Sequence, residues 1–140
     1  MRNAAGSGVQ VQLSVRRGRE AISFYRDAFG AVEVFRFEGD GEVVAQLAVG
    51  ETVFWVEDES PEHDNFSPET LGGATERLLL VVDDPEEVFE RALTLGARQV
   101  RPIEEAHGWL LGRVADPFGH HWEIARPLGS WPPSDEEVGL

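Results

Sequence analysis

The chain has 140 residues, of which 41% are hydrophobic and 27% charged, a balance typical of a globular protein. Its formal net charge of −14 argues against binding to nucleic acid, because a phosphate backbone requires a basic surface. The absence of cysteine excludes disulfides and thiolate metal sites. The longest apolar run, 78–82, is far shorter than the roughly 20 residues of a membrane span. With no N-terminal signal segment, these features predict a cytoplasmic protein that does not associate with membranes.

The first half of the chain predicts a strand, a helix and three further strands. Apolar and polar residues alternate over 9–15, which indicates a half-buried strand. An apolar stripe from Ala21 to Phe29 predicts a helix that ends at Gly30. The three following strands are expected at Val32–Phe37, Val43–Val49 and Thr52–Glu57, with glycine-containing turns between them.

The second half repeats this order after a polar connector at 58–73. A strand is expected at Glu76–Val82, followed by a helix with Pro85 in its first position and Asp83 or Asp84 as its cap. Gly96-Ala97 then matches Gly30-Ala31 of the first half. The last three strands are expected at Gln99–Ile103, Trp109–Val114 and His120–Ala125.

The repeat predicts an α+β protein that forms a single domain over residues 1–140. Its parts are a loose start at 1–8, module one at about 9–57, the connector 58–73, module two at about 74–126 and a tail at 127–140. Each βαβββ module is expected to form a curved mixed sheet with its helix on the outer face, and the two sheets to enclose a ligand-binding cleft. In the acidic tail, Trp131 is expected to dock on the body or on a second subunit.

Several short motifs give the chain a resemblance to a known family. They are Gln10–Val15, Phe24-Tyr25 with Ala28–Ala31, Leu71–Gly73, and Asp116–His120 with Trp122-Glu123. In this order they resemble the glyoxalase/bleomycin-resistance superfamily, also called vicinal oxygen chelate proteins, and within it the PhnB-like branch. The resemblance covers about residues 9–126 and implies paired βαβββ modules, frequently in a homodimer. The superfamily includes isomerases, dioxygenases, epimerases, metal-dependent resistance enzymes and metal-free antibiotic binders, so the resemblance alone leaves the function open.

The same resemblance implies four metal-ligand positions, on the first and last strand of each module. The first falls on Gln10 and the fourth on Glu123, both of which offer oxygen ligands. The second falls on Phe54, or on Trp55 if the register slips by one residue, and neither can bind a metal. The third falls on Glu76 or Arg77. A divalent ion would therefore be held by Gln10, Glu76 and Glu123, a set without histidine that suits zinc, nickel or iron poorly.

These positions can alternatively line a metal-free binding cleft. Strand alternation places polar or aromatic side chains on potential ligand-facing surfaces at Gln10, Gln12, Phe54, Trp109, His121 and Glu123. Aromatic surface together with amide groups and one carboxylate would suit an aromatic or cationic small molecule.

Both kinds of residue also have a purely structural explanation. The aromatic residues can simply belong to the core. A carboxylate between Trp122 and Ile124 is costly unless it is solvated, paired or liganded, so a salt bridge from Glu123 to Arg77 or Arg113 is the alternative to a ligand-facing role.

The sequence thus leads to three functional hypotheses. The first is a homodimeric small-molecule binder without a cofactor, similar to the antibiotic-sequestering members. The second is a lyase or isomerase resembling lactoylglutathione lyase, in which a divalent metal polarises vicinal substrate oxygens and Glu123 serves as the catalytic carboxylate. The third is a dioxygenase, which the missing histidines disfavour.

Overall fold

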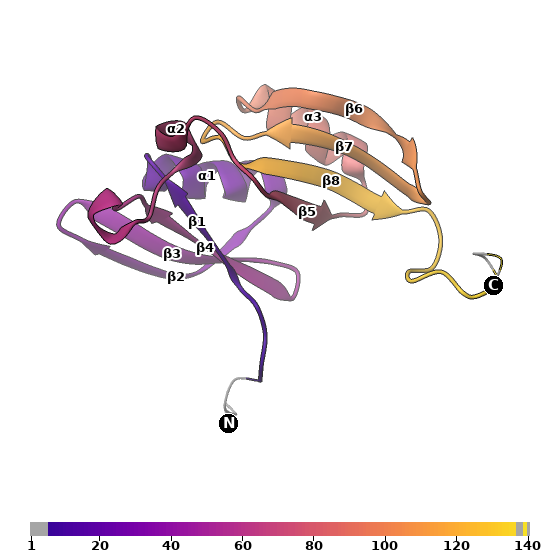
Figure 1. Cartoon of the computed structure of the whole chain (residues 1–140), viewed down its shortest axis with the longest axis horizontal. Coiled ribbons are helices and arrows are strands. Elements are labelled where there is room, and N and C mark those ends of the chain that lie inside the picture. Colours follow the sequence, from indigo (N-terminus) through magenta and orange to yellow (C-terminus); the bar gives the residue numbers. More distant parts are fainter. Residues whose placement is uncertain (1–5, 137–138, 140) are drawn as a thin grey trace. The chain divides into compact units, whose positions relative to one another are not determined.

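The computed structural model describes residues 6–136 and 139 and shows two compact units, Met1–Ser67 and Pro68–Leu140. Each unit contains a strand, a helix and three further strands in that order (Figure 1). The predicted α+β class and the paired βαβββ modules are therefore confirmed. Residues 1–5 of the expected loose start, and 137, 138 and 140 of the acidic tail, lie outside the described residues.

The first unit is a four-stranded mixed sheet with one long helix. Its elements are β1 (Val11–Val15), α1 (Gly18–Phe29), β2 (Val32–Gly39), β3 (Glu42–Val49) and β4 (Thr52–Asp58), followed by a short 3₁₀ helix at Pro61–His63. The strand order is β1-β4-β3-β2, with β1 parallel to β4 and the other pairs antiparallel. Gly30 ends α1 with a φ of 72°, a conformation that glycine adopts without a steric penalty.

One side of this sheet packs against α1. The helix buries Ala21, Ile22 and Tyr25 completely, and Leu13 and Val56 of the sheet are buried with them. Aromatic rings fill much of this layer, because Tyr25 is stacked on Phe29 and meets Phe54 edge-to-face. The core of the first unit therefore lies between α1 and one face of its sheet.

The second unit repeats the arrangement. It contains a short helix α2 (Pro68–Leu71), then β5 (Arg77–Val81), α3 (Pro85–Thr94), β6 (Arg98–Ala106), β7 (Trp109–Ala115) and β8 (His121–Pro127). The strand order is β5-β8-β7-β6, again with the first pair parallel. Of the two predicted caps, Asp84 is the one that caps α3, because its Oδ1 accepts a hydrogen bond from the backbone N–H of Glu87 at 3.1 Å.

The turn between β7 and β8 is organised by a buried carboxylate. Asp116 Oδ1 accepts hydrogen bonds from the backbone N–H groups of Phe118 and His120, at 2.9 and 3.0 Å. Its Oδ2 accepts another from the indole Nε1 of Trp122 at 2.9 Å. The Asp-Pro-Phe-Gly-His motif therefore fixes the turn and holds Trp122 in the core, where it is buried.

The structure corrects the alignment of the two modules by one residue. Leu13 of β1 is buried and lies opposite Val56, whereas the residue buried in the same way on β5 is Leu80, which lies opposite Ile124. Aligning Gly30 with Gly96 would instead match Leu13 with Leu79. Module one therefore has one residue more than module two between these strand positions and the glycines that follow the helices, and the difference lies in the helical segment, where α1 has 12 residues and α3 has 10. No helix among the described residues is long and apolar enough to cross a membrane.

Candidate ligand-binding faces

Each sheet has one face that its own helix does not cover, which we call its open face. Directly opposed residues of neighbouring strands point to the same side of a sheet. In the first unit, the helix-facing residues include Leu13, Leu47 and Val56, so their strand neighbours point to the open face. The pairing of the strands in each sheet determines which side chains lie on its open face, and these side chains form the candidate sites.

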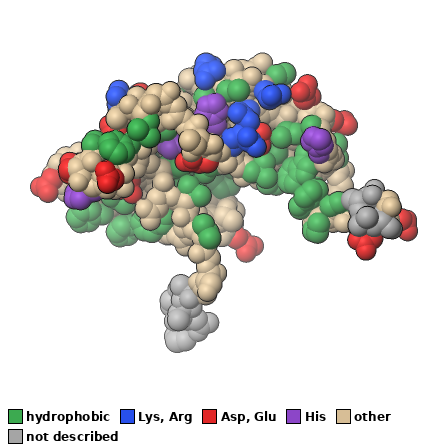
Figure 2. Space-filling view, viewed as in Figure 1, with side chains coloured by type: hydrophobic (Ala, Val, Ile, Leu, Met, Phe, Trp, Pro, Cys, Tyr) green, Lys and Arg blue, Asp and Glu red, His purple; other side chains and the backbone are tan. Residues whose placement is uncertain are grey.

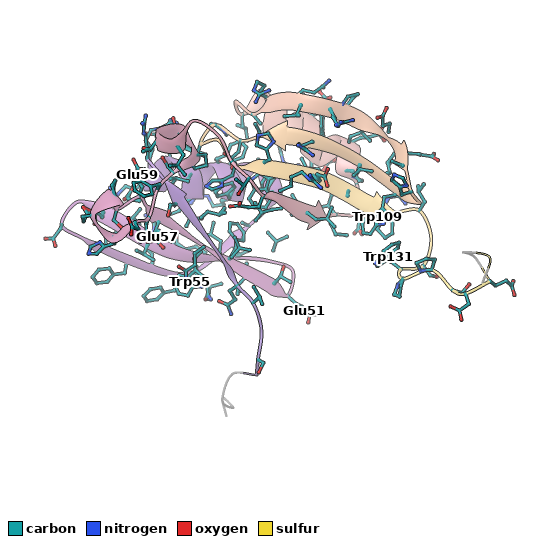
Figure 3. The ribbon with its side chains drawn as sticks, in the orientation of Figure 1. Glu51, Trp55, Glu57, Glu59, Trp109 and Trp131 are labelled. Carbon is teal, nitrogen blue, oxygen red and sulfur yellow. The ribbon has the colours of Figure 1, made fainter. Side chains whose placement is uncertain are left out.

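The open face of the first unit centres on Trp55. This residue lies opposite Gln12 on one side and Gln46 on the other, and Gln46 in turn lies opposite Phe35. The indole Nε1 of Trp55 donates a hydrogen bond to Gln10 Oε1 at 2.9 Å, and Phe35 meets the indole edge-to-face with 6.3 Å between ring centroids. Figure 3 shows Trp55 projecting from β4. Two contacts therefore hold the indole in place among side-chain amides.

A carboxylate shares this open face. Glu57 follows Trp55 by two residues on β4 and lies opposite Ser14 and Val44 (Figure 3). Partial burial raises the pKa of the Glu57 carboxyl, because desolvation disfavours its charged form. The face thus combines aromatic surface, amide groups and the carboxyl group of Glu57.

Phe54 does not lie on this face, contrary to the prediction. It is only 8% exposed and meets Tyr25 of α1 edge-to-face, so it belongs to the core. Trp55 lies on the open face instead, at the position that the sequence analysis gave as the alternative to Phe54. The prediction failed because the aligned turn glycines do not precede the equivalent strand positions by the same number of residues: Trp55 follows Gly50 by five residues, whereas Glu123 follows Gly119 by four.

The open face of the second unit centres on Glu123. Its Oε2 lies 3.5 Å from Arg77 Nε and 3.6 Å from Arg113 Nη2. The salt bridge that the sequence offered as the alternative to a ligand-facing role is therefore present, and it involves both candidate arginines. Arg77, and not Glu76, occupies the position on β5 that faces His121, so the predicted metal ligand Glu76 is replaced there by a cation.

His121 also lies on this open face. Burial lowers its pKa, and the positive charges of Arg113 and Arg98 lower it further. The neutral imidazole is therefore favoured at neutral pH.

The residues at the four metal-ligand positions do not fit a metal ion. In the structural register they are Gln10, Trp55, Arg77 and Glu123. Trp55 and Arg77 cannot coordinate a cation, Gln10 Oε1 already accepts from Trp55, and Glu123 is paired with two guanidinium groups. Among the described residues, no cluster of three or more His, Asp or Glu side chains is arranged to hold a metal.

Trp109 has a neighbour that the sequence did not identify as its partner. The tail places Trp131 edge-to-face against it, with 5.1 Å between the ring centroids, and Figure 3 shows the two indoles together. Trp131 therefore docks on its own unit. The Trp109 ring, which was predicted to line a ligand-binding cleft, is therefore in contact with the tail.

Two features of these faces were missed in the sequence. Gln46 and Phe35 complete the surroundings of Trp55. The alternation of side chains along β3 and β2 could have indicated them, but alternation shows which residues share a face of the sheet only when the pairing of the strands is known. Arg98 and Arg101 accompany Arg77 and Arg113 on the second open face. Their clustering could not be inferred, because the four arginines come from three strands.

Comparisons with known proteins agree with this architecture. A family model described as Glyoxalase/Bleomycin resistance protein/Dioxygenase superfamily matches residues 9–124. The chain is 38% identical over 122 residues to the uncharacterised protein Mb0911c of Mycobacterium bovis, covering 83% of this chain and 80% of that protein. The crystal structure of TioX from Micromonospora sp. ML1 matches with a TM-score of 0.68 and 28% identity, over 88% of this chain and 100% of TioX. The fosfomycin resistance protein FosX from Mesorhizobium loti shares the fold, with a TM-score of 0.64 and 15% identity over 98% of this chain and 100% of FosX.

Proposed function

This chain belongs to the Glyoxalase/Bleomycin resistance protein/Dioxygenase superfamily, and we propose that it binds a small aromatic molecule without a metal, as a sequestering or resistance-type member. We also assign it to the PhnB-like branch, on the Phe24-Tyr25 and Asp116–His120 motifs. The observation that carries the proposal is the oriented indole of Trp55 on the open face of the first unit, with Gln10 as the acceptor of its N–H.

The surroundings of Trp55 support an aromatic or cationic ligand. Phe35 and Phe37 lie on the same open face and are 49% and 61% exposed, so apolar ring surface is available to a ligand. Gln12 and Gln46 flank the indole and can direct polar groups of the ligand. The carboxylate of Glu57 on this face would attract a positive charge.

The metal-dependent lyase or isomerase has weaker support. Its chemistry requires oxygen or nitrogen donors at positions that Trp55 and Arg77 occupy. Glu123, the proposed catalytic carboxylate, is engaged by Arg77 and Arg113. The donor chemistry therefore favours the metal-free binder over the enzyme.

The proposal can be tested with acridine orange, a planar cationic aromatic probe, at physiological salt. We expect saturable one-to-one binding, weakened roughly tenfold by Trp55→Leu, because the substitution keeps apolar area but removes the aromatic face and its N–H donor. Trp131→Leu is the matched control, since Trp131 lies in the second unit and contacts Trp109. Equal binding by the wild type and Trp55→Leu would contradict the proposal.

The metal alternative has a separate test. Thermal shift measurements with Mn²⁺, Ni²⁺ or Zn²⁺ should give no specific increase in Tm under the metal-free proposal. A stoichiometric metal-induced stabilisation that Glu123→Gln abolishes would support the lyase or isomerase instead. A cytoplasmic homodimer remains part of the proposal, and light scattering coupled to size-exclusion chromatography measures the assembly directly.

A further inference from the structure

We propose that the open face of the second unit binds an oxyanion, namely the carboxylate or phosphate group of a small molecule. Four arginines on three strands form this arginine face, which consists of Arg77, Arg98, Arg101 and Arg113 around Glu123. In Figure 1 α3 lies behind this sheet, and Figure 2 shows basic side chains gathered on the side turned to the viewer. The proposal goes beyond the aromatic site on the first unit and does not depend on it.

The register of β6 and β7 places two positive charges opposite each other. Arg101 lies directly opposite Arg113, and like charges in such cross-strand positions destabilise a sheet. Arg98 and Arg101 form no ion pair with any described residue. Like charges placed opposite each other without a compensating interaction are expected at a functional site.

Glu123 compensates the cluster only partly. Arg77 and Arg113 each reach the same oxygen, Oε2, through a single nitrogen, at 3.5 and 3.6 Å. Neither pair has the two parallel hydrogen bonds of a strong arginine–carboxylate contact. The Nε of Arg113 is buried and has no hydrogen-bond partner among the described residues, which is a costly arrangement.

A hollow of suitable size lies within the arginine face. It measures about 210 Å³, and its lining includes Arg77, Arg101 and Arg113 together with Glu123 and Glu104. This volume is below the roughly 300–1,000 Å³ of complete small-molecule sites, so it suits an anionic group rather than an entire ligand. Guanidinium groups present planar pairs of N–H donors that match carboxylate and phosphate oxygens.

The electrostatics of His121 agree with a positive potential at this place. Its pKa is lowered first by burial and then by Arg113 and Arg98, although the whole chain carries a net charge of −14. A negatively charged protein repels anions in general. Binding of an oxyanion would therefore require a local cluster of this kind.

The test is a titration of the full chain with inorganic phosphate at constant ionic strength maintained with NaCl, followed by Tm. Phosphate should raise Tm more than chloride does, and Arg101→Gln should weaken the apparent affinity by about tenfold, because a charge-assisted hydrogen bond is lost. Arg91→Gln is the matched control, since it removes the same charge from α3, where Arg91 pairs with Glu87. Its affinity should stay within about twofold of the wild type.

A second variant separates a binding site from a purely structural cluster. Glu123→Gln removes the carboxylate that competes for the arginines, so phosphate should bind more tightly and stabilise this variant more than the wild type. The proposal is overturned if phosphate acts no differently from chloride, if Arg91→Gln and Arg101→Gln lose affinity equally, or if Glu123→Gln weakens phosphate binding. Acridine orange binding by Arg101→Gln should be unchanged, so failure of this proposal and failure of the aromatic site are distinguishable.

Discussion

At the scale of single residues, two carboxylates on neighbouring elements have different roles. Asp116 is buried and accepts three hydrogen bonds, two from backbone N–H groups and one from the indole of Trp122. Glu123 retains partial exposure and faces guanidinium groups. A buried carboxylate whose lone pairs are used by donors from its own turn stabilises the fold. A half-exposed one at the edge of a hollow can respond to a ligand.

The role of Asp116 predicts a large loss of stability in Asp116→Ala. Three donors would remain buried without their acceptor, so we expect the free energy of unfolding to fall by about 2–4 kcal/mol. Urea denaturation monitored by circular dichroism measures this change. The control is Asp135→Ala, in the exposed tail, which should change stability by less than about 0.5 kcal/mol. Similar effects of the two substitutions would contradict the role of Asp116.

His121 predicts a pH dependence. Its pKa in the folded protein lies below the reference value of 6.5, so below this pH the unfolded chain binds a proton that the folded chain resists. The contribution to stability is therefore lost as the pH falls from about 6.5 towards the lowered folded pKa. His121→Gln should show a smaller loss of stability between pH 7.5 and about 5.5 in urea titrations. The control is His63→Gln, at an exposed position. If this variant lost as little stability between these pH values as His121→Gln, the pH dependence would not be due to His121.

At the scale of elements, the start of α1 is tied to the sheet through one aspartate. Asp58, the last residue of β4, accepts hydrogen bonds from the backbone N–H of Gly18 at 2.7 Å and from that of Val43 at 2.8 Å. A Cβ at Gly18 would lie 2.5 Å from Val43 Cγ1 and 2.9 Å from Asp58 Oδ1. The helix can approach β3 and β4 this closely because residue 18 has no side chain.

Gly18→Ala should therefore destabilise the protein although alanine favours helices. The added methyl group must displace Val43 or Asp58, and we expect a loss of about 1–3 kcal/mol in urea denaturation. Gly73→Ala is the matched control, because a Cβ there meets no atom within 4 Å. If Gly18→Ala were as stable as the control, the close approach of α1 would not limit packing.

At the scale of the whole chain, the dominant property is its charge of −14. Acidic residues are spread along the sequence, and a large net charge destabilises a folded state through self-repulsion. The exposed ion pairs, such as Arg17–Glu20 and Arg91–Glu87, contribute little to stability. Repulsion among the acidic side chains should therefore outweigh the attraction within these exposed ion pairs.

This balance predicts that salt stabilises the protein. Raising NaCl from about 20 mM to about 300 mM shortens the screening length and should increase Tm. Salt weakens both the repulsion among the acidic side chains and the attraction within the ion pairs, but the repulsion is the larger of the two. Differential scanning calorimetry at pH 7.5 measures the shift. A decrease in Tm would mean that attractive pairs dominate the electrostatics of the chain.

The sequence alone determined the fold and most of its boundaries. Strand alternation, the helical stripes, Gly30 and the acidic cap followed by Pro85 at the start of α3 are local signals, and the elements that they predict are present, with ends that differ by up to three residues. The candidate residues Gln10, Gln12, His121 and Glu123 were likewise placed on open faces. Local patterns suffice for these features because backbone geometry and periodicity depend on neighbouring residues.

Only the tertiary structure decided which partners these residues have. A shift of one residue along a strand moves the assigned position to the other face, and the structure places Trp55 and Arg77, rather than Phe54 and Glu76, on the open faces. The arginine face arises because β5, β6 and β7 bring together residues that are up to 36 positions apart, from Arg77 to Arg113. Sheet register is set by packing over the whole unit, so the charge surrounding Glu123 could not be predicted from its neighbours in sequence.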